Sequence, residues 1–459
     1  MVGCHPRPDV RRGAASLHVL QRRLRRGRGR RQPEKPAWLP GRPGGAQGAG
    51  HRSHRAASLP GRSHRRSRPP QPGHPPSPED GCRHLARADR APVHPERDLR
   101  PGVEAIARQR SPAAEQDGST DAGRPTATVV VLNWNGRRYL DDCLEALLVQ
   151  EVDGGFEPML VDNASTDGSV EHVRRRWPQV RVVRSTVNLG FAAGNNLGMR
   201  AASGRHLVLL NTDTRVQTGW LSALISAAEL EPRIGAVTSK LVFMADPGEI
   251  QNAGSLLLSD GSGADRGFHE RDAGQYDCRE EVFGACGAAV LYRREMLDDV
   301  GHFDETFFNY YEDTDLNWRM RLRGWKVLYE PAALVHHVHT GSSGEWSPFF
   351  TFHVDRNRLF MILKNAPPRM VMDSVGHFAG LSGRNAARTM MGRFMRPPQA
   401  LRRADLGPGR ARIHVDVVRS LAAHMPEMLA KRRQVRRRRT VPDRDIESWF
   451  YPRDLWLSR

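Results

Sequence analysis

The sequence is poor in cysteine and has no long apolar run. Its 459 residues include 5 cysteines, which stand far apart and form no CxxC pair. This excludes a small disulfide-rich fold and a cysteine-based zinc site, and it favours a reducing compartment. No run of about 18 apolar residues is present to span a bilayer, and the Arg-rich start lacks the apolar stretch of a signal peptide. We therefore expect a cytoplasmic protein, soluble or held peripherally on the inner face of the plasma membrane.

Acidic residues are scarce only toward the two ends of the chain. Residues 1–125 hold 26 Lys and Arg against 11 Asp and Glu, and residues 371–459 hold 19 against 8. Residues 126–370 are mildly acidic, with 25 basic against 32 acidic side chains. The net charge of +19 therefore does not describe the central segment, and we expect no nucleic acid as its partner.

Residues 1–125 are rich in Arg, Pro, Gly, His and Ser, with almost no aromatic residues and no sustained apolar period. This composition predicts a disordered extension, because such a segment cannot bury a core. Two other interpretations stay open, a basic arm for nucleic acid and an upstream extension outside the native protein. The first would need aromatic side chains among the basic runs, on which bases could stack.

The central segment alternates buried strand patterns with amphipathic helical patterns. The predicted strands cover residues 129–132, 159–161, 180–183 and 207–210. This order predicts an α/β fold, with a Rossmann-like, mostly parallel sheet and helices on both of its faces. Further along, we expect a Gly-rich strand at 283–292, a helix at 313–323 and a strand at 325–329. We assign residues 126–370 to one folded domain and residues 371–459 to a basic, mainly helical region.

Polar clusters follow the predicted strands where each strand ends. They are NWNG at 133–136, DNASTDGS at 162–169, NLGFAAGNNLG at 188–198 and NTD at 211–213. Each cluster alone could be a helix cap or a turn. Because the carboxyl ends of parallel strands share one edge of the sheet, the four together predict a site for a ligand with many hydroxyl and phosphate oxygens. Asp213 suits a divalent cation shared with phosphate, Mg²⁺ or Mn²⁺.

These motifs resemble the family 2 glycosyltransferases of the GT-A fold, especially their rhamnosyltransferase-like branch. The resemblance runs from Thr128 to about Pro368 and includes EDTDL at 312–316, HVH at 337–339 and RNR at 356–358. It implies that the domain at 126–370 is catalytic and moves a sugar, with inversion, from a nucleotide-sugar donor to an acceptor hydroxyl. The donor it suggests is dTDP-rhamnose. The acceptor would be a polysaccharide or a polyprenyl-diphosphate-linked saccharide in cell-envelope glycan synthesis.

The resemblance also implies roles for single residues on the donor side. Asp162 would read the nucleotide base, and the rest of the donor pocket would comprise Asn133, Asn135, Asn163, Asn188, Gly190, Asn195 and Asn211. Asp213 matches the last residue of the family's DxD metal motif. Asn211 stands in place of the first Asp, so the metal site has one carboxylate fewer. His337 or His339 would complete the coordination, although both could instead be ordinary histidines at a strand end.

Asp313 matches the family's catalytic base, which accepts the proton of the acceptor hydroxyl. Glu312 and Asp315 would lie beside it in the acceptor site, at a helix start where the dipole favours negative charge. Their crowding is expected to raise at least one carboxyl pKa. In the alternative interpretation, the three carboxylates only decorate an exposed helix N-terminus. Arg356 and Arg358 belong either to a helix near the site or to the surface.

Other functions and contacts stay open at this point. A polyprenyl-phosphate sugar synthase would keep the same fold, whereas a nucleic-acid-binding protein would use the Arg-rich flanks and bind with steep salt dependence. The basic run at 431–439 follows apolar residues at roughly helical spacing. It is either a solvated tail or a contact with an anionic membrane face.

Overall fold

The computed structural model describes residues 123–338, 347–394 and 408–457. They all belong to one of two units, Leu99–Arg459; the other unit, Met1–Asp98, lies outside the described residues. The disorder expected for residues 1–125 and the metal role expected for His339 therefore fall wholly or almost wholly outside the described part. Within that part, no helix is both long and apolar enough to cross a membrane.

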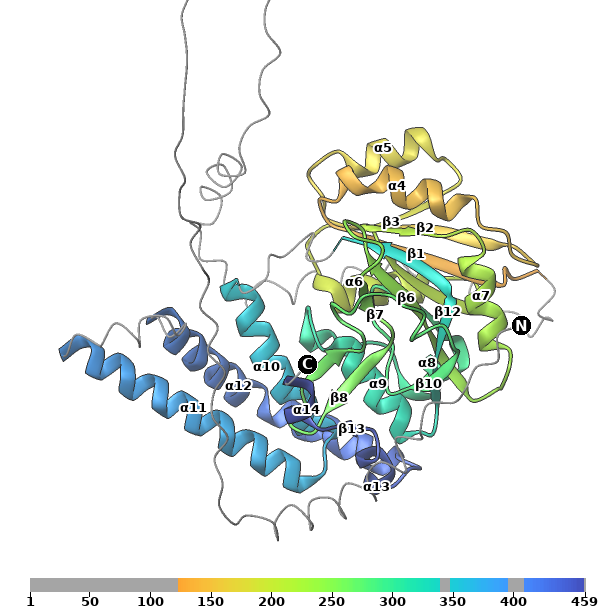
Figure 1. Ribbon diagram of the computed structural model, residues 1–459. Coiled ribbons are helices and arrows are strands. Elements are labelled where there is room, and N and C mark those ends of the chain that lie inside the picture. Colours follow the sequence, from red (N-terminus) through yellow and green to blue (C-terminus); the bar gives the residue numbers. More distant parts are fainter. Residues whose placement is uncertain (1–122, 339–346, 395–407, 458–459) are drawn as a thin grey trace, which may run out of the picture. The chain divides into compact units, whose positions relative to one another are not determined.

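A sheet of ten strands forms the centre of the described fold (Figure 1). Its first half is a parallel group in the order β4-β1-β2-β3, comprising β1 (Ala127–Asn133), β2 (Phe156–Asn163), β3 (Arg181–Ser185) and β4 (His206–Asn211). Strand β1 is almost fully buried, as expected for a strand covered on both faces. The predicted α/β fold with a mostly parallel sheet is confirmed.

Helices cover both faces of this sheet, since successive side chains of a strand point to opposite sides. Val129 and Val131 of β1 pack with the helices of one layer, α4 (Arg137–Leu148), α5 (Ser169–Arg176) and α7 (Trp220–Ala228). Val130 packs with the helices of the other layer, α6 (Gly190–Ala201), α8 (Arg294–Val300) and α9 (Glu312–Leu322). Figure 1 shows α4 and α5 on one side of the parallel strands and α6 on the other.

The second half of the sheet differs from the sequence prediction in two places. The strand expected at 283–292 is present only as β11 (Ala289–Arg293), and a separate strand, β10 (Glu280–Val282), precedes it, because the segment between them turns to pack on α9 through Asn317. Strand β12 (Lys326–His337) is longer than expected, because its last residues pair with β5 (Thr214–Val216) and β6 (Ile234–Phe243). Strand β11 is antiparallel to both β4 and β6.

The remaining elements lie at one end of the sheet and in the C-terminal region. They are β7 (Ile250–Asn252), β8 (Ser255–Leu258), β9 (Gly263–Asp265), the 3-10 helix η2 (Glu305–Phe307), α10 (Pro348–Asn365), α11 (Pro368–Phe394), α12 (Pro408–Arg438), α13 (Asp443–Glu447), β13 (Phe450–Tyr451) and α14 (Arg453–Leu457). Strand β13 pairs with β8 in a second, three-stranded sheet. Met428 of α12 and Ile446 of α13 share a buried cluster with Trp318 of α9. The C-terminal region is therefore packed against the sheet domain.

The basic run at 431–439 is used inside the fold. Lys431 forms an ion pair with Asp304 at 2.6 Å. Arg432 and Arg436 both donate hydrogen bonds to the carbonyl of Ala366, just after the end of α10, and Arg436 also pairs with Asp443. Cations that bind the last carbonyls of a helix stabilise its C-terminus. The interpretation of this run as a free solvated tail is therefore wrong.

Candidate active site

The carboxyl ends of β1 and β2 place Asn133 and Asp162 opposite each other in register, and both are fully buried. Asn133 Nδ2 donates to Ser165 Oγ at 3.0 Å, and the Ser165 amide donates to Asp162 Oδ1 at 3.3 Å. Within the described residues, Asn133 Oδ1 and Asp162 Oδ2 accept no hydrogen bond, although Arg184 Nε lies 3.6 Å from the latter. A buried acceptor without a donor costs about 1–3 kcal/mol. The pair therefore suits a ligand that brings N–H or O–H donors.

Asn135 joins the loop after β1 to the loop after β2. Its backbone adopts a left-handed conformation with φ of 52°, which Asn tolerates better than most residues. Its Oδ1 accepts from the Thr166 amide at 2.8 Å, and its own amide donates to Ser165 Oγ at 3.0 Å. The next position, 136, requires glycine, because a Cβ there would lie 2.6 Å from Asn133 Oδ1. Asn135 thus holds the two loops together beside the Asn133–Asp162 pair.

Asn163, Asn188 and Gly190 form a second polar group at the start of α6. Asn163 Nδ2 donates to Asn188 Oδ1 at 2.9 Å and to the Gly190 carbonyl at 3.1 Å. Gly190 has φ of 75°, and a Cβ there would meet the Phe308 carbonyl at 2.5 Å. Asn195 is buried and donates to the Phe191 carbonyl at 3.0 Å. The structure therefore gives these four residues contacts that shape the loop.

Asp213 and His337 are brought together because the end of β12 pairs with β5. His337 Nε2 lies 3.2 Å from Asp213 Oδ1, and His337 Nδ1 lies 2.9 Å from Gln251 Oε1. An amide oxygen only accepts, so Nδ1 carries the hydrogen and Nε2 faces the carboxylate. Either a proton or a metal cation must then lie between them. Gln251 holds the imidazole nitrogen that points away from the carboxylate, as is usual for histidines that bind a metal. The Asp213–His337 pair therefore fits a divalent cation.

Asp213 and His337 do not belong to a larger cluster of metal-ligating side chains in the described part of the chain. No group of three or more His, Cys, Asp or Glu side chains gathers among the described residues. Asn211 is half-buried, and its backbone amide donates to the Ala288 carbonyl at 2.9 Å. A cation at Asp213 and His337 would therefore need oxygen ligands from a bound phosphate, as Mg²⁺ commonly does.

Asp313 lies in the first turn of α9, half-buried, and is held on both of its oxygens. Oδ2 accepts from the Gly287 amide at 3.1 Å, and Oδ1 accepts from the Thr314 amide at 2.6 Å. Burial raises the pKa of Asp313 above its usual range, and these hydrogen bonds offset only part of that effect. Burial, followed by the charge of Asp313, raises the pKa of Glu312 further still. Burial is the larger cause of the raised pKa values, ahead of the crowding that the sequence suggested.

A short backbone connection joins Asp313 to the Asp213–His337 pair. Gly287 donates to Asp313, and the next residue, Ala288, accepts from the amide of Asn211, two residues before Asp213. A Cβ on Gly287 would lie 3.3 Å from the ring of Phe191 in α6. Gly287 is a further residue of this site, and its one signal in the sequence is the recurrence of glycine at 284 and 287 before a strand.

Comparison with known proteins identifies the family. The model for glycosyl transferase family 2 matches residues 128–301. The chain is also 32% identical over 208 residues to the N-acetylglucosaminyl-diphospho-decaprenol L-rhamnosyltransferase of Mycobacterium tuberculosis (strain ATCC 25618 / H37Rv), a match that covers 40% of this chain and 67% of that protein. The chain belongs to glycosyltransferase family 2. The predicted family, enzyme class and GT-A type of fold are thereby confirmed.

Two further similar proteins show how much of its length the chain shares with its relatives. The O-antigen biosynthesis protein RfbC of Myxococcus xanthus is 29% identical over 225 residues, which is 47% of this chain but only 17% of that protein. A crystal structure of GalNAc-T7 with UDP, GalNAc and Mn²⁺ aligns with a TM-score of 0.43 at 16% identity, covering 53% of this chain and 48% of that one. The chain thus spans less than half of the length of these two proteins.

Asp315 of the glycosyltransferase has surroundings different from those of Asp313. Its side chain is fully buried and lies 2.8 Å from Arg319 Nε, Lys364 Nζ and Asn365 Nδ2. Burial alone would raise the pKa of Asp315, but Lys364 and Arg319 lower it overall. It therefore exposes no surface that an acceptor could touch. Glu312 is also buried, so the interpretation of an exposed helix N-terminus is wrong.

The loop before Asp313 is held in a strained conformation by α10. Phe308, Tyr310 and Tyr311 have φ between 64° and 70°, a region that non-glycine residues rarely adopt. The buried Asn357 donates through Nδ2 to the carbonyls of Phe307, Asn309 and Tyr310 at 2.8–2.9 Å. Its neighbour Arg356 is buried and donates to the carbonyls of Thr306 and Phe307. Arg356 is therefore no surface charge, and Asn357 is a positioning residue that sequence reasoning missed.

Replacing Asn357 should loosen this loop. Asn357→Ala removes one donor from each of three carbonyls, although that of Phe307 keeps Arg356 and the Asn309 amide, so we expect the free energy of unfolding to fall by about 1–3 kcal/mol. Urea denaturation of the glycosyltransferase would measure the change. Asn309→Ala is the matched control, because it removes an amide from the same loop but keeps the carbonyl that Asn357 binds. Equal stability of the two variants would contradict the role given to Asn357.

Proposed function

We propose that this glycosyltransferase moves a sugar from a nucleoside diphosphate to an acceptor hydroxyl in a single displacement that inverts the anomeric centre. The observation that carries the proposal is the connection through Gly287, Ala288 and Asn211. It links a carboxylate of raised pKa, Asp313, to the strand end that leads to the Asp213–His337 pair. A base on one side and a leaving-group site on the other are the two parts that such a displacement needs.

Asp313 accepts the proton in this mechanism. As the acceptor oxygen forms its bond to the anomeric carbon, the bond from that carbon to the phosphate oxygen breaks, and the hydroxyl proton passes to an Asp313 oxygen. A carboxylate with a raised pKa is a better proton acceptor than an ordinary one. The Gly287 and Thr314 hydrogen bonds fix its orientation before the acceptor arrives.

The donor nucleotide is assigned to the edge formed by β1, β2 and β4. Asn133 Oδ1 and Asp162 Oδ2 would accept hydrogen bonds from the base, and an imide N–H of thymine or uracil supplies such a donor. Asp213 and His337 would hold Mg²⁺ or Mn²⁺, which when bound neutralises the charge on the departing diphosphate. Asn135, Asn163, Asn188, Gly190 and Asn195 then shape the pocket through the loop contacts described above.

The finer assignment follows the Mycobacterium tuberculosis relative, whose name gives an L-rhamnosyl transfer to a diphospho-decaprenol-linked N-acetylglucosamine. We assign dTDP-rhamnose as donor and a polysaccharide or a polyprenyl-diphosphate-linked saccharide as acceptor, in cell-envelope glycan synthesis. Arg433 and Arg437 of α12 are exposed and could meet an anionic membrane surface where lipid-linked acceptors reside. In the alternative, a polyprenyl-phosphate sugar synthase, the acceptor is a phosphate that is already ionised. Such an acceptor would not need Asp313 as a general base.

Removing Asp213 tests the donor site. We expect titration calorimetry with dTDP, UDP and GDP to show binding of one of them in Mn²⁺ or Mg²⁺, and loss of that binding in EDTA. Asp213→Ala should weaken it at least tenfold, on the order of the 10–100-fold effects seen for groups that support a metal. Asp298→Ala, an exposed carboxylate of α8, is the control. Metal-dependent binding that survives in Asp213→Ala would contradict the assignment.

A further inference from the structure

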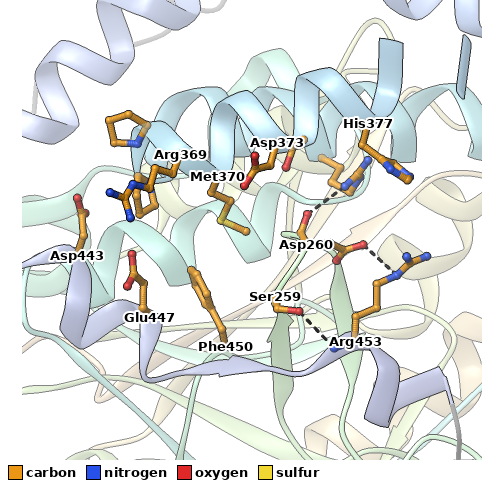
Figure 2. A pocket seen from close by; sticks show the side chains of 14 residues that line it. Ser259, Asp260, Arg369, Met370, Asp373, His377, Asp443, Glu447, Phe450 and Arg453 are labelled. Carbon is orange, nitrogen blue, oxygen red and sulfur yellow. Dashed lines mark hydrogen bonds and ion pairs between the residues drawn. The ribbon is translucent and has the colours of Figure 1, made fainter. Parts of the chain in front are cut away.

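A cavity of about 790 Å³ opens between α11 and the C-terminal segment of the chain (Figure 2). Its wall comes from α10, the first turns of α11, the turn between β8 and β9, and the segment from α13 to α14. None of the residues that line it follows β1, β2 or β4, so it is not the donor edge. Cavities of about 300–1,000 Å³ are the usual size of small-molecule sites.

One helix face and one opposing segment supply the polar groups of this cavity. Arg369, Asp373 and His377 recur every four residues on α11 and so lie on one face of the helix. Figure 2 shows Glu447 and Phe450 on the opposite wall, pointing toward that helix. Among the described residues, these three α11 side chains and Glu447 form no hydrogen bond or ion pair within the chain. Three charged side chains and one imidazole that converge on one space are thus available to a ligand.

The opposing wall is fixed in place by the core of the domain. Phe450 pairs in register with Leu257 of β8, and the Ser259 amide donates to the Tyr451 carbonyl at 2.9 Å. Arg453 pairs with Asp260 at 3.0 Å, a contact drawn in Figure 2. The ring of Phe450 packs edge-on against the buried Trp318, with ring centroids 6.0 Å apart, so it is held before any ligand arrives, which lowers the entropy that binding must overcome.

The charge pattern indicates a neutral, polyhydroxylated ligand. Three arginines line the cavity (Arg358, Arg369 and Arg453), and so do four carboxylates (Asp260, Asp373, Asp443 and Glu447). A polyanion would be repelled by the carboxylates and a polycation by the arginines. A sugar ring presents hydroxyls that both donate and accept, and its C–H face can pack on an aromatic side chain. Phe450 with Met370 supplies such an apolar surface.

The cavity wall is continuous with the loop that carries Asp313. The turn between β8 and β9 contributes Ser259 and Asp260 to the cavity, and Gly263 at its far end donates to Tyr311 Oη at 3.3 Å. Tyr311 is two residues before Asp313. Arg358, from the helix that holds this loop, donates to the Asp260 carbonyl at 3.1 Å.

We propose that this cavity binds the saccharide part of the acceptor, namely the sugar units that adjoin the one whose hydroxyl reaches Asp313. The inference rests on the proposed function, because it gives the acceptor glycan a place of its own in the C-terminal region. The same sugar could be presented by a free polysaccharide end or by a diphosphate-linked precursor. The cavity recognises the neutral saccharide that both share.

The test uses the full chain and an array of neutral oligosaccharides of two to six residues, each presented free and through a reducing-end diphosphate. We expect binding to some of them, with Phe450→Ala and Asp373→Asn at least tenfold weaker. Nucleotide binding should stay unchanged in both variants. Met372→Ala is the matched control, because Met372 lies on α11 outside the cavity and is 74% exposed. Preference for the diphosphate-linked form would identify the precursor as the source, and equal binding would identify a polysaccharide end.

Three results would overturn the inference. Saccharide binding that is unchanged in both cavity variants would place the acceptor elsewhere. Nucleotide binding without any saccharide binding would remove the site but leave the proposed function standing, whereas absence of both would overturn the proposed function as well. Should Phe450→Ala fold poorly, Asp373→Asn decides alone, because Asp373 is exposed and forms no bond that holds the fold.

Discussion

Asp313→Asn is expected to lower kcat by about 10²–10⁴-fold, the usual contribution of a general base. Donor affinity should stay close to wild type, because the proton transfer from the acceptor belongs to the transition state and not to the ground-state complex. The amide keeps the size of the carboxylate but cannot accept a proton. Nucleotide titration and single-turnover sugar transfer on the same preparation would separate binding from chemistry.

The pH dependence of turnover gives an independent readout of Asp313. A base works in its deprotonated form, so kcat should rise with pH through the pKa of this carboxyl. Because burial raises that pKa, the acidic limb should lie above the value of about 4 that is ordinary for Asp. The limb should vanish in Asp313→Asn.

Asp298→Asn is the matched control, since it makes the same change on an exposed side chain of α8. It should keep both the turnover and the acidic limb of the wild type. Near-normal turnover in Asp313→Asn, with the limb retained, would show that another group is the base.

The arrangement of the donor half of the candidate site could be predicted because its signals are local. Each parallel strand is a short apolar run that ends in polar residues, and the topology of a parallel sheet brings those ends to one edge. Asn133 and Asp162 are 29 residues apart, yet the register of β1 and β2 places them opposite each other. The same reasoning placed Asp213 at this edge, but its contact with His337 needed the family resemblance.

The acceptor half could not be predicted in the same way, because its contacts are long-range. Asn357 binds carbonyls 47 to 50 residues earlier in the chain, and no local pattern shows which loop it faces. Lys431 reaches Asp304 across 127 residues, so part of a run that looks like a solvated tail is held against the fold. The cavity against α11 likewise depends on Phe450 pairing with β8.

Asp315 shows how a tertiary contact overrides a local rule. A carboxylate in the first turn of a helix is expected to stabilise the fold by only about 0.3–1 kcal/mol through the helix dipole. Here Asp315 pairs with Lys364, which also contacts Asp304 at 2.7 Å, and Asp304 in turn pairs with Lys431. Helices α9, α10 and α12 therefore meet in one buried network of alternating charges.

Asp315→Asn is expected to lower the free energy of unfolding by about 3–5 kcal/mol, the cost of removing one partner from a buried ion pair. Arg319 and Lys364 would keep their charges in a buried place with less compensation. Urea denaturation would measure the loss, and the exposed Asp298→Asn again serves as control. The double variant with Lys364→Met should recover part of the loss, because it removes a buried cation that the single variant leaves with one carboxylate, Asp304, instead of two.

The pH dependence of this loss follows from the lowered pKa of Asp315 in the folded protein. A carboxylate whose pKa is lowered on folding stabilises the protein above its ordinary pKa of about 4, and this contribution disappears as the pH falls through the lowered value. The difference between wild type and Asp315→Asn should thus be constant from neutral pH to about 4 and shrink below it. A loss under about 1 kcal/mol at neutral pH would instead match a surface charge at a helix end and would rule out the buried network as its cause.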